Sequence, residues 1–401
     1  MPRIGRYICP HICPLVQVTV FYKKTVFSLF FAFVLLKIAV GCAIIKKKWA
    51  SVRKNTLVKV NNMKKMKRWM SLGLAALSAF AMFGFGGCGD KKGAEITVYM
   101  PDGAPALALA GAMSLDVPDD GITYRVVDSS VIATKVSAND PADNADVCIL
   151  PVNVAAKKLG DGSAYQMIGL VTQGNLYFIS NQDVADVDDL SVLQGKTVGL
   201  AQIANVPGLT LKAAVNRNGG AWQELKEGAE VAEDKVNLQG LANNNAITGE
   251  LPYYLAAEPF VTMKTMGGAF RVVGDLQTLY NGVSSEQVGY PQAVMVAKRS
   301  LIEKNKAWVS GFVQMVENKQ NWAETADTTD VYLSIVRHFD DKERTPVFKL
   351  ETLTKDCISR CGIAFARTKD CMTRVDAFLS ELVQIAPAAT NTVSQDFYWL
   401  G

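Results

Sequence analysis

Residues 63–88 constrain this chain more than any other stretch, because they decide which residues remain to form a globular protein. A basic cluster between Lys64 and Arg68 precedes an apolar run at residues 71–85, and small residues follow up to Cys88. A basic start, an apolar run that is short for a bilayer span and a small-residue end are the parts of a signal peptide. We therefore expect everything after Cys88 to be an exported globular protein.

The cysteine that ends this segment adds a second expectation. Residues 85–88, Phe-Gly-Gly-Cys, resemble the lipobox of bacterial lipoproteins, whose cysteine becomes the first mature residue and carries the lipid. Phe85 departs from the Leu or Val that is more usual at its position. The resemblance implies lipid attachment at Cys88 and an extracytoplasmic protein anchored to the cell membrane. An ordinary signal peptide or an uncleaved anchor is the alternative.

A second apolar run lies upstream, at residues 25–45, between flanking lysines. It is about long enough to cross a bilayer, although Lys37 interrupts it. A transmembrane helix followed at once by a complete signal would be redundant. We interpret residues 1–62 as an over-extended N-terminus, with translation starting at Met63, and keep an extra transmembrane segment as the alternative.

The overall charge of +4 averages two unlike parts. The first 88 residues hold 15 of the 42 Lys and Arg and none of the 38 Asp and Glu, which leaves 27 basic against 38 acidic side chains in the remainder. The exported part is therefore acidic, near −11. This argues against nucleic acid as a partner, since phosphates require a basic surface.

Cysteine and histidine are too sparse for a metal site. Beyond Cys88 the chain has Cys148, Cys357, Cys361 and Cys371, without paired C-x2-C spacings, and its only histidine after the leader is His338. We expect no metal and no cofactor. A disulfide stays possible in an exported chain, and buried thiols are the simpler expectation.

After the leader, the pattern alternates between strands and helices, which predicts an α/β fold. The expected strands are residues 96–100, 122–127, 146–150, 165–180, 197–200, 236–238, 253–256, 270–275 and 290–297. The expected helices are 106–114, 131–139, 152–159, 209–218, 241–248, 307–324, 353–361 and 370–384. The stretch 165–180, broken at 173–175, and the stretch 290–297 are long enough to cross between two domains.

Several motifs, in this order, resemble one family. They are Val98-Tyr99-Met100-Pro101-Asp102-Gly103-Ala104-Pro105, Ala145-Asp146-Val147 to Asn153, Asp189-Leu190 with Leu193-Gln194-Gly195-Lys196-Thr197-Val198-Gly199-Leu200, Ala257-Glu258-Pro259-Phe260, and Tyr290-Pro291-Gln292-Ala293-Val294. The chain is similar to the extracytoplasmic solute-binding lipoproteins of ABC importers, in the type II branch for nitrate, sulfonate, taurine and thiamine precursors. Their order and spacing carry the resemblance, which covers almost all of the mature chain.

The resemblance implies a two-lobed type II periplasmic-binding-protein fold with two crossover strands at the hinge. Lobe I would comprise residues 94–174 plus 290–401, and lobe II residues 175–289. Such a protein is a monomer that captures a small organic, partly anionic solute between its lobes and delivers it to an ABC permease. A sensing or adaptor lipoprotein of the same fold is the alternative.

Candidate ligand-binding residues follow expected strands or lie on expected crossings. They are Asp102, Gly103, Ala104, Asn153, Gly174, Asn175, Gln202, Ala204, Asn205, Glu258 and Tyr290. The loops after the first strand of each lobe lead into helices, whose free N–H groups favour an anionic group. Asp102 and Asn153 could instead cap helices, and Asn175 and Tyr290 could serve the hinge alone.

Two further features limit the function. Related folds include enzymes of thiamine-pyrimidine and menaquinone biosynthesis, but this chain carries an export signal and lacks a nucleophile elbow, a zinc-protease motif and a phosphate-cradling glycine loop. We expect no catalytic residues. The loops that follow the first strand of each lobe contain no arginine, so bidentate binding of sulfate or nitrate is not expected. This favours a larger solute with an aromatic or amide portion.

Overall fold

The computed structural model describes residues 95–114, 121–137, 144–282 and 289–401. The expectations for residues 1–62, for the signal at 63–88 and for the lipid on Cys88 lie outside these residues. Residues 91–401 form one compact unit, and the fold below is that of this unit. Within the described ranges, no helix combines the length and hydrophobicity needed to cross a membrane.

The first sheet takes its strands from both ends of the described chain. Its six strands lie in the order β12 (Ile363–Arg367), β4 (Tyr165–Thr172), β11 (Ala293–Lys298), β3 (Val147–Pro151), β1 (Ile96–Pro101) and β2 (Ile122–Val127). β1 is parallel to β2 and β3, whereas β11 is antiparallel to β3 and β4, and β12 is antiparallel to β4. Strands β1 to β4 therefore all point the same way.

The second sheet is built from the middle of the chain. Its six strands lie in the order β10 (Arg271–Asp275), β5 (Leu176–Ser180), β9 (Tyr253–Ala257), β6 (Thr197–Ala201), β8 (Val236–Leu241) and β7 (Trp222–Glu224). β6, β7, β8 and β9 are mutually parallel, and β5 runs antiparallel to its neighbours β9 and β10. We call the first sheet with its helices lobe I and the second with its helices lobe II.

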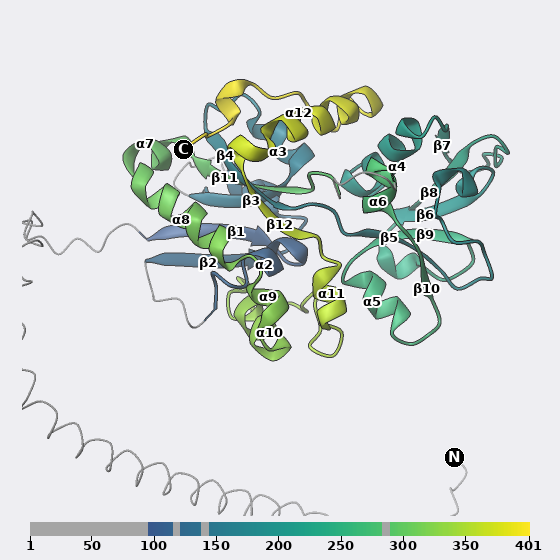
Figure 1. Cartoon of the computed structure of the whole chain (residues 1–401), viewed down its shortest axis with the longest axis horizontal. Coiled ribbons are helices and arrows are strands. Elements are labelled where there is room, and N and C mark those ends of the chain that lie inside the picture. The colour runs from purple at the N-terminus through teal and green to yellow at the C-terminus, as the bar shows by residue number, and fades with distance from the viewer. Residues whose placement is uncertain (1–94, 115–120, 138–143, 283–288) are drawn as a thin grey trace, which may run out of the picture. The chain divides into compact units, whose positions relative to one another are not determined.

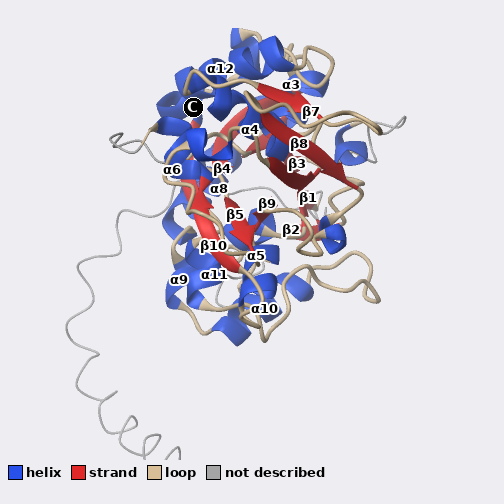
Figure 2. Ribbon diagram, turned by 90° about the vertical axis from the view of Figure 1, so that its right-hand side faces the viewer, coloured by secondary structure: helices blue, strands red, loops and turns tan. Residues whose placement is uncertain are grey.

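Helices cover both sheets. Lobe I has α2 (Ala104–Ala108), α3 (Val152–Leu159), α7 (Arg299–Lys304), α8 (Lys306–Lys319), α9 (Trp322–Thr325), α10 (Thr328–Val336), α11 (Lys355–Ser359) and α12 (Thr368–Ile385), and lobe II has α4 (Val206–Arg217), α5 (Phe260–Thr265) and α6 (Leu276–Asn281). Figure 1 shows the two sheets side by side, with α12 reaching toward α4. Figure 2 shows the strands in the middle, with α12 and α3 on one side and α9, α10 and α11 on the other.

The apolar core explains why the two lobes form one unit. One cluster of buried side chains joins α12 and α3 of lobe I to α4 of lobe II, and it includes Leu150, Phe378, Leu200 and Leu209. A second cluster lies under α2, α8 and α10, and a smaller third cluster lies on the opposite face of the lobe II sheet. Burial on this scale is the main term that stabilises a fold.

The expected α/β class, with two lobes joined by two crossings, is confirmed. Strands β4 and β5 belong to different sheets, and so do β10 and β11, so the chain crosses once near residue 174 and once between β10 and β11. The single-residue lobe boundaries at 174/175 and 289/290 stay predictions.

Four secondary-structure expectations are wrong. The helix expected at 106–114 is only the short α2, which begins at Ala104 and ends at Ala108, and turns follow it. The helix at 241–248 is absent, because β8 continues to Leu241 and only a 3₁₀ turn, Asn244–Ala246, follows; Asn243 Oδ1 accepts a hydrogen bond from the backbone N–H of Asn245 at 2.9 Å, which competes with a helix. The helix at 131–139 is only the 3₁₀ helix Ile132–Val136. Strand β12 lies where only helices were expected. It was missed because its partner β4 is far away in the sequence.

Candidate functional site

The strand pairing brings the carboxyl ends of both sheets to face each other. β4 ends at Thr172, and β5 begins in the other sheet at Leu176. Leu176 pairs with Ala257, the last residue of β9, and β6 and β8 run parallel to β9. The ends of β6, β8 and β9 therefore face the ends of β1, β3 and β4 across the crossing. Ligands of open α/β sheets bind at such carboxyl edges.

Asp102 follows β1 at this edge, but both of its oxygens are engaged within lobe I. Oδ1 accepts from the N–H of Gly103 and Oδ2 from the N–H of Val347, each at 2.9 Å, and Nη2 of Arg344 lies 3.7 Å from Oδ2. Burial raises the pKa of Asp102, although the N–H donors and Arg344 act in the opposite direction. Asp102 therefore holds the segment around Val347 in place, and both of its carboxylate oxygens already have partners within lobe I.

Gly103 and Ala104 begin helix α2. Gly103 has φ +112°, which favours glycine, and a Cβ there would have no atom within 4 Å. The backbone conformation, not crowding, is therefore what requires glycine. Ala104 is buried at the first position of the helix.

Asn153 follows β3 and lies in the first turn of α3. It is almost completely buried and does not cap the helix. Its Nδ2 donates to the carbonyl of Ala389 at 3.4 Å, and its Oδ1 has no hydrogen-bond partner among the described residues. A buried side-chain oxygen without a partner is uncommon in native proteins and requires an explanation.

Gly174, Asn175 and Tyr290 hold the crossing. Gly174 has φ +97°, and a Cβ there would lie 2.9 Å from the ring of Tyr290. Nδ2 of Asn175 donates to the carbonyl of Glu258 at 3.1 Å, and Oδ1 of Asn175 accepts from Nε2 of Gln292 at 2.6 Å.

The ring of Tyr290 is fully buried. It stacks on Phe378, and its hydroxyl donates to Oε1 of Gln277 at 3.3 Å. Burial raises the pKa of Tyr290 well above its ordinary value. These contacts give Tyr290 a structural role at the hinge.

The candidate residues of lobe II lie in an exposed loop between β6 and α4. Gln202, Ala204 and Asn205 are all exposed. Gln202 has φ +57°, an uncommon conformation for a residue other than glycine. Asn205 occupies the N-cap of α4 but makes no capping hydrogen bond with its side chain. These side chains remain free to contact a solute from the lobe II side.

Glu258 follows β9 and forms an ion pair with lobe I. Its side chain is completely buried; Oε1 accepts from Nε of Arg360 at 2.6 Å and from the hydroxyl of Thr262 at 3.0 Å, while Oε2 accepts from the N–H of Thr262 at 3.0 Å. The hydroxyl of Tyr177 donates to the carbonyl of Arg360 at 3.2 Å. Glu258 therefore joins the lobes and is already neutralised.

Sequence reasoning missed the arginines that reach this edge. Arg344, Arg360 and Arg374 all come from the last third of the chain, outside the two loops in which an arginine was sought. Nη2 of Arg374 donates to Oε1 of Gln173 at 2.5 Å, and burial lowers the pKa of Arg374. No local signal marks these residues, since their partners are distant in sequence.

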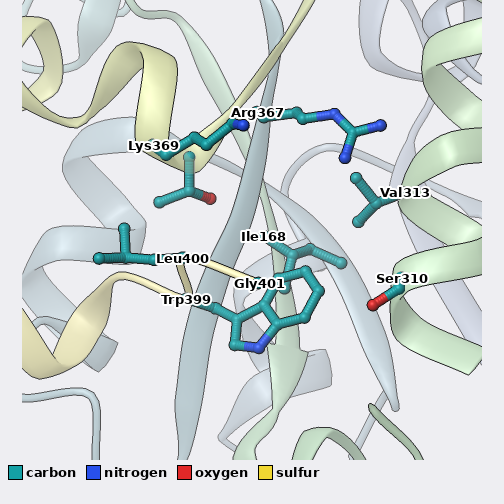
Figure 3. Close-up of a pocket in the computed structure, with 9 residues that line it drawn as sticks. Ile168, Ser310, Val313, Arg367, Lys369, Trp399, Leu400 and Gly401 are labelled. Atoms are coloured by element: carbon teal, nitrogen blue, oxygen red, sulfur yellow. The ribbon is translucent and has the colours of Figure 1, made fainter. Parts of the chain in front are cut away.

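Two surface hollows lie within single lobes. The hollow in Figure 3, about 90 Å³, lies in lobe I beside the start of α12, with the side chains of Arg367 and Lys369 on one side and the ring of Trp399 on the other. A second hollow, about 260 Å³, lies beside the C-terminal end of α4. None of the predicted site residues lines either hollow.

The cysteines of the described chain show no sign of chemistry. Cys148, Cys357, Cys361 and Cys371 are free and buried. Burial raises the pKa of Cys371 to about 11, which disfavours the reactive thiolate. Within the parts of the chain that the structure describes, no group of three or more His, Cys, Asp or Glu side chains could hold a metal ion.

No protein-family model and no curated protein matches the sequence. Solved structures match the fold. A structure of an ABC transporter protein from Parabacteroides distasonis gives a TM-score of 0.59 at 17% identity, over 76% of this chain and 99% of that chain. The periplasmic aliphatic sulphonate binding protein SsuA from Escherichia coli gives 0.51 at 12% identity, over 76% and 94%.

A third structure, the ligand binding component of an ABC-type import system from Staphylococcus aureus with zinc bound, gives a TM-score of 0.50 at 11% identity, over 76% of this chain and 96% of that chain. At such identities the likeness concerns the fold. The expected resemblance to two-lobed periplasmic binding proteins is confirmed at that level.

Proposed function

We propose that this chain captures a small organic solute between its two lobes and delivers it to an ABC permease. One observation carries the proposal: the carboxyl edges of two α/β sheets face each other across two crossings of the chain. A solute held there would contact both lobes, so binding would favour the closed arrangement. The proteins with the same fold include a sulphonate-binding protein and a component of an import system.

In this proposal the chain is a binding protein and not an enzyme. At the facing edges, the carboxylates of Asp102 and Glu258 are both engaged with arginine and N–H donors. Neither is free to act as a general base in this arrangement. The exposed loop of lobe II, ahead of α4, is the place where an anionic part of the solute would be bound, because a helix N-terminus favours negative charge.

The proposed location is outside the cytoplasm, with a lipid anchor on Cys88. This rests on the signal-like segment and its lipobox resemblance. The intact mass of the protein from membranes tests it: the expected chain begins at Cys88 and carries acyl groups. A chain that retains residues before Cys88 without lipid would contradict the anchor.

Native mass spectrometry of the full-length gene product, purified in mild detergent, tests solute binding. We expect a small noncovalent mass that is lost on denaturation, or a compound class that raises the melting temperature with its concentration. A protein without bound solute, indifferent to sulfonates, carboxylates, amides and amino acids, would contradict the proposed function.

A further inference from the structure

Two side-chain amides at the lobe I edge each form a hydrogen bond through only one of their two polar atoms. Asn153 bonds the carbonyl of Ala389 through Nδ2, and Gln292 bonds Oδ1 of Asn175 through Nε2. The other polar atom of each amide is buried and has no partner among the described residues. Asn153 is almost fully buried, whereas Gln292 as a residue is partly exposed.

The neighbours of these amides determine which atom is free. The carbonyl of Glu258 can only accept, so Asn175 must present its NH₂ group there and its oxygen to Gln292. Gln292 must then present NH₂ to Asn175, which leaves its Oε1 free. By the same reasoning, the carbonyl of Ala389 requires the NH₂ of Asn153 and leaves its Oδ1 free. Both free atoms are therefore oxygens, which accept hydrogen bonds.

The two acceptors flank adjacent strands at the edge that faces lobe II, since Asn153 follows β3 and Gln292 precedes β11. Ala293 of β11 pairs with Pro151 of β3, and the N–H of Val152 donates to the carbonyl of Gln292 at 3.0 Å. Asn153 is the next residue along. The β4 strand, on the other side of β11, ends at Thr172, whose buried hydroxyl also lacks a partner but can donate as well as accept.

The charges at this edge favour a neutral partner for these oxygens. At these two atoms an anion such as a sulfonate would meet carbonyl oxygens; an anionic part of the solute would instead find the Nε–H groups of Arg344 and Arg374, which have no partner among the described residues. A cation would find no free carboxylate there, because Glu258 is paired with Arg360 and Asp102 is bonded to Val347 near Arg344. Arg374, whose Nη2 donates to Gln173 and whose Nε has no partner among the described residues, adds positive charge on the α12 side.

We propose that lobe I recognises its solute through hydrogen bonds that a neutral N–H group, of carboxamide or amino-heterocycle type, donates to Oδ1 of Asn153 and Oε1 of Gln292. This inference rests on the proposed function and names the chemistry of the group that the solute places against lobe I. An anionic group elsewhere on the same solute is compatible with it, at the α4 end of lobe II.

The test compares compounds that differ only in this group. Calorimetry and thermal shift on the full-length protein in mild detergent would use nicotinamide, nicotinate and pyridine-3-sulfonate as one set, and succinamate and succinate as another. We expect the amide of each set to bind at least tenfold more tightly than its acidic counterparts. A tighter acid or sulfonate, or a panel in which no amide binds, would overturn the inference.

Variants separate recognition from folding. Asn153→Leu removes the free acceptor together with the Nδ2 donor to the carbonyl of Ala389, so we expect a modestly lower melting temperature and amide binding at least tenfold weaker. Gln292→Leu should weaken amide binding similarly. Gln384→Leu, at an exposed position of α12, is the matched control and should change nothing. Unchanged amide binding in both leucine variants would mean that water satisfies these oxygens, and would overturn the inference.

Failure of the inference and failure of the proposed function give different results. If a sulfonate or acid binds more tightly than the matching amide, or if a co-purified solute proves to have no N–H donor, the solute-binding function stands and only the inference fails. If native mass spectrometry shows no solute and no compound of any class shifts the melting temperature, both fail.

Discussion

The two facing edges differ in how firmly their side chains are held. On lobe I, Asp102 and Asn153 are buried and bonded to segments of the same lobe. On lobe II, Gln202 and Asn205 lie in an exposed loop without side-chain hydrogen bonds. The difference indicates that lobe I is a preformed half of the site, whereas the lobe II loop completes its contacts only when a solute is present.

The lobes are also tied together in two unequal ways. The Glu258–Arg360 pair is deeply buried on the glutamate side, while the pair between Arg217 of α4 and Glu381 of α12 has side chains 39% and 27% exposed. Both pairs join elements of different lobes. Four predictions test this picture, from the largest expected effect to the smallest.

Arg360→Met should destabilise the protein most. It leaves the carboxylate of Glu258 buried with the two Thr262 donors and the thiol of Cys357, whose Sγ lies 3.7 Å from Oε2, and an uncompensated buried charge is costly. We expect a loss of about 3 kcal/mol in the free energy of unfolding by urea titration. Arg217→Met is the matched control at the exposed pair and should cost about 0.5 kcal/mol. Equal losses of unfolding free energy in the two variants would refute the difference between the buried and the exposed ion pair.

Gly362→Ala tests whether the crossing is held rigidly against lobe I. A Cβ at this residue, where φ is +63°, would lie 1.7 Å from the carbonyl oxygen of Gly174. Because backbone rather than a flexible side chain must give way, we expect a loss of about 2 kcal/mol or more in thermal or urea unfolding. Gly311→Ala, on the exposed face of α8 where nothing lies within 4 Å, should be neutral or stabilising. If Gly362→Ala leaves the free energy of unfolding unchanged, the crossing is not held rigidly.

A pair of alanine variants compares the two edges directly. Asp102→Ala strands the N–H groups of Gly103 and Val347 and should cost about 1–2 kcal/mol. Asn205→Ala removes no side-chain hydrogen bond and should cost well below the usual ~1 kcal/mol of a lost N-cap. Solute affinity should nevertheless fall in Asn205→Ala. A large stability loss in that variant would mean that lobe II is as preformed as lobe I.

The smallest expected effect is a loss of stability of lobe I at acid pH, caused by protonation of His338. Burial lowers the pKa of His338, whose ring lies edge-on to Tyr124. The unfolded state then binds the proton first, so stability is full above the ordinary value near 6.5 and is lost as the pH falls toward the lower folded pKa. Melting temperatures between pH 8 and 5 should fall less steeply in His338→Gln. Identical profiles would exclude this histidine as a contributor.

Strands with long β-branched runs were predictable from the sequence, and so was the general alternation of strands and helices. Strand partners were not, because pairing between β12 and β4 depends on residues about 200 positions apart, which no local pattern records. For the same reason Glu258 was recognised but its partner Arg360 was missed. Gln292 could have been found, since it directly precedes a strand that begins at the facing edge.

Hydrogen–deuterium exchange of the full-length protein, with and without the solute identified by mass spectrometry, tests the central claim most directly. Binding between the lobes should protect peptides around Asn153 in lobe I and Asn205 in lobe II together, and leave the outer helix α8 unchanged. Protection confined to one lobe, or to the hollow beside the start of α12, would contradict a solute site between the lobes.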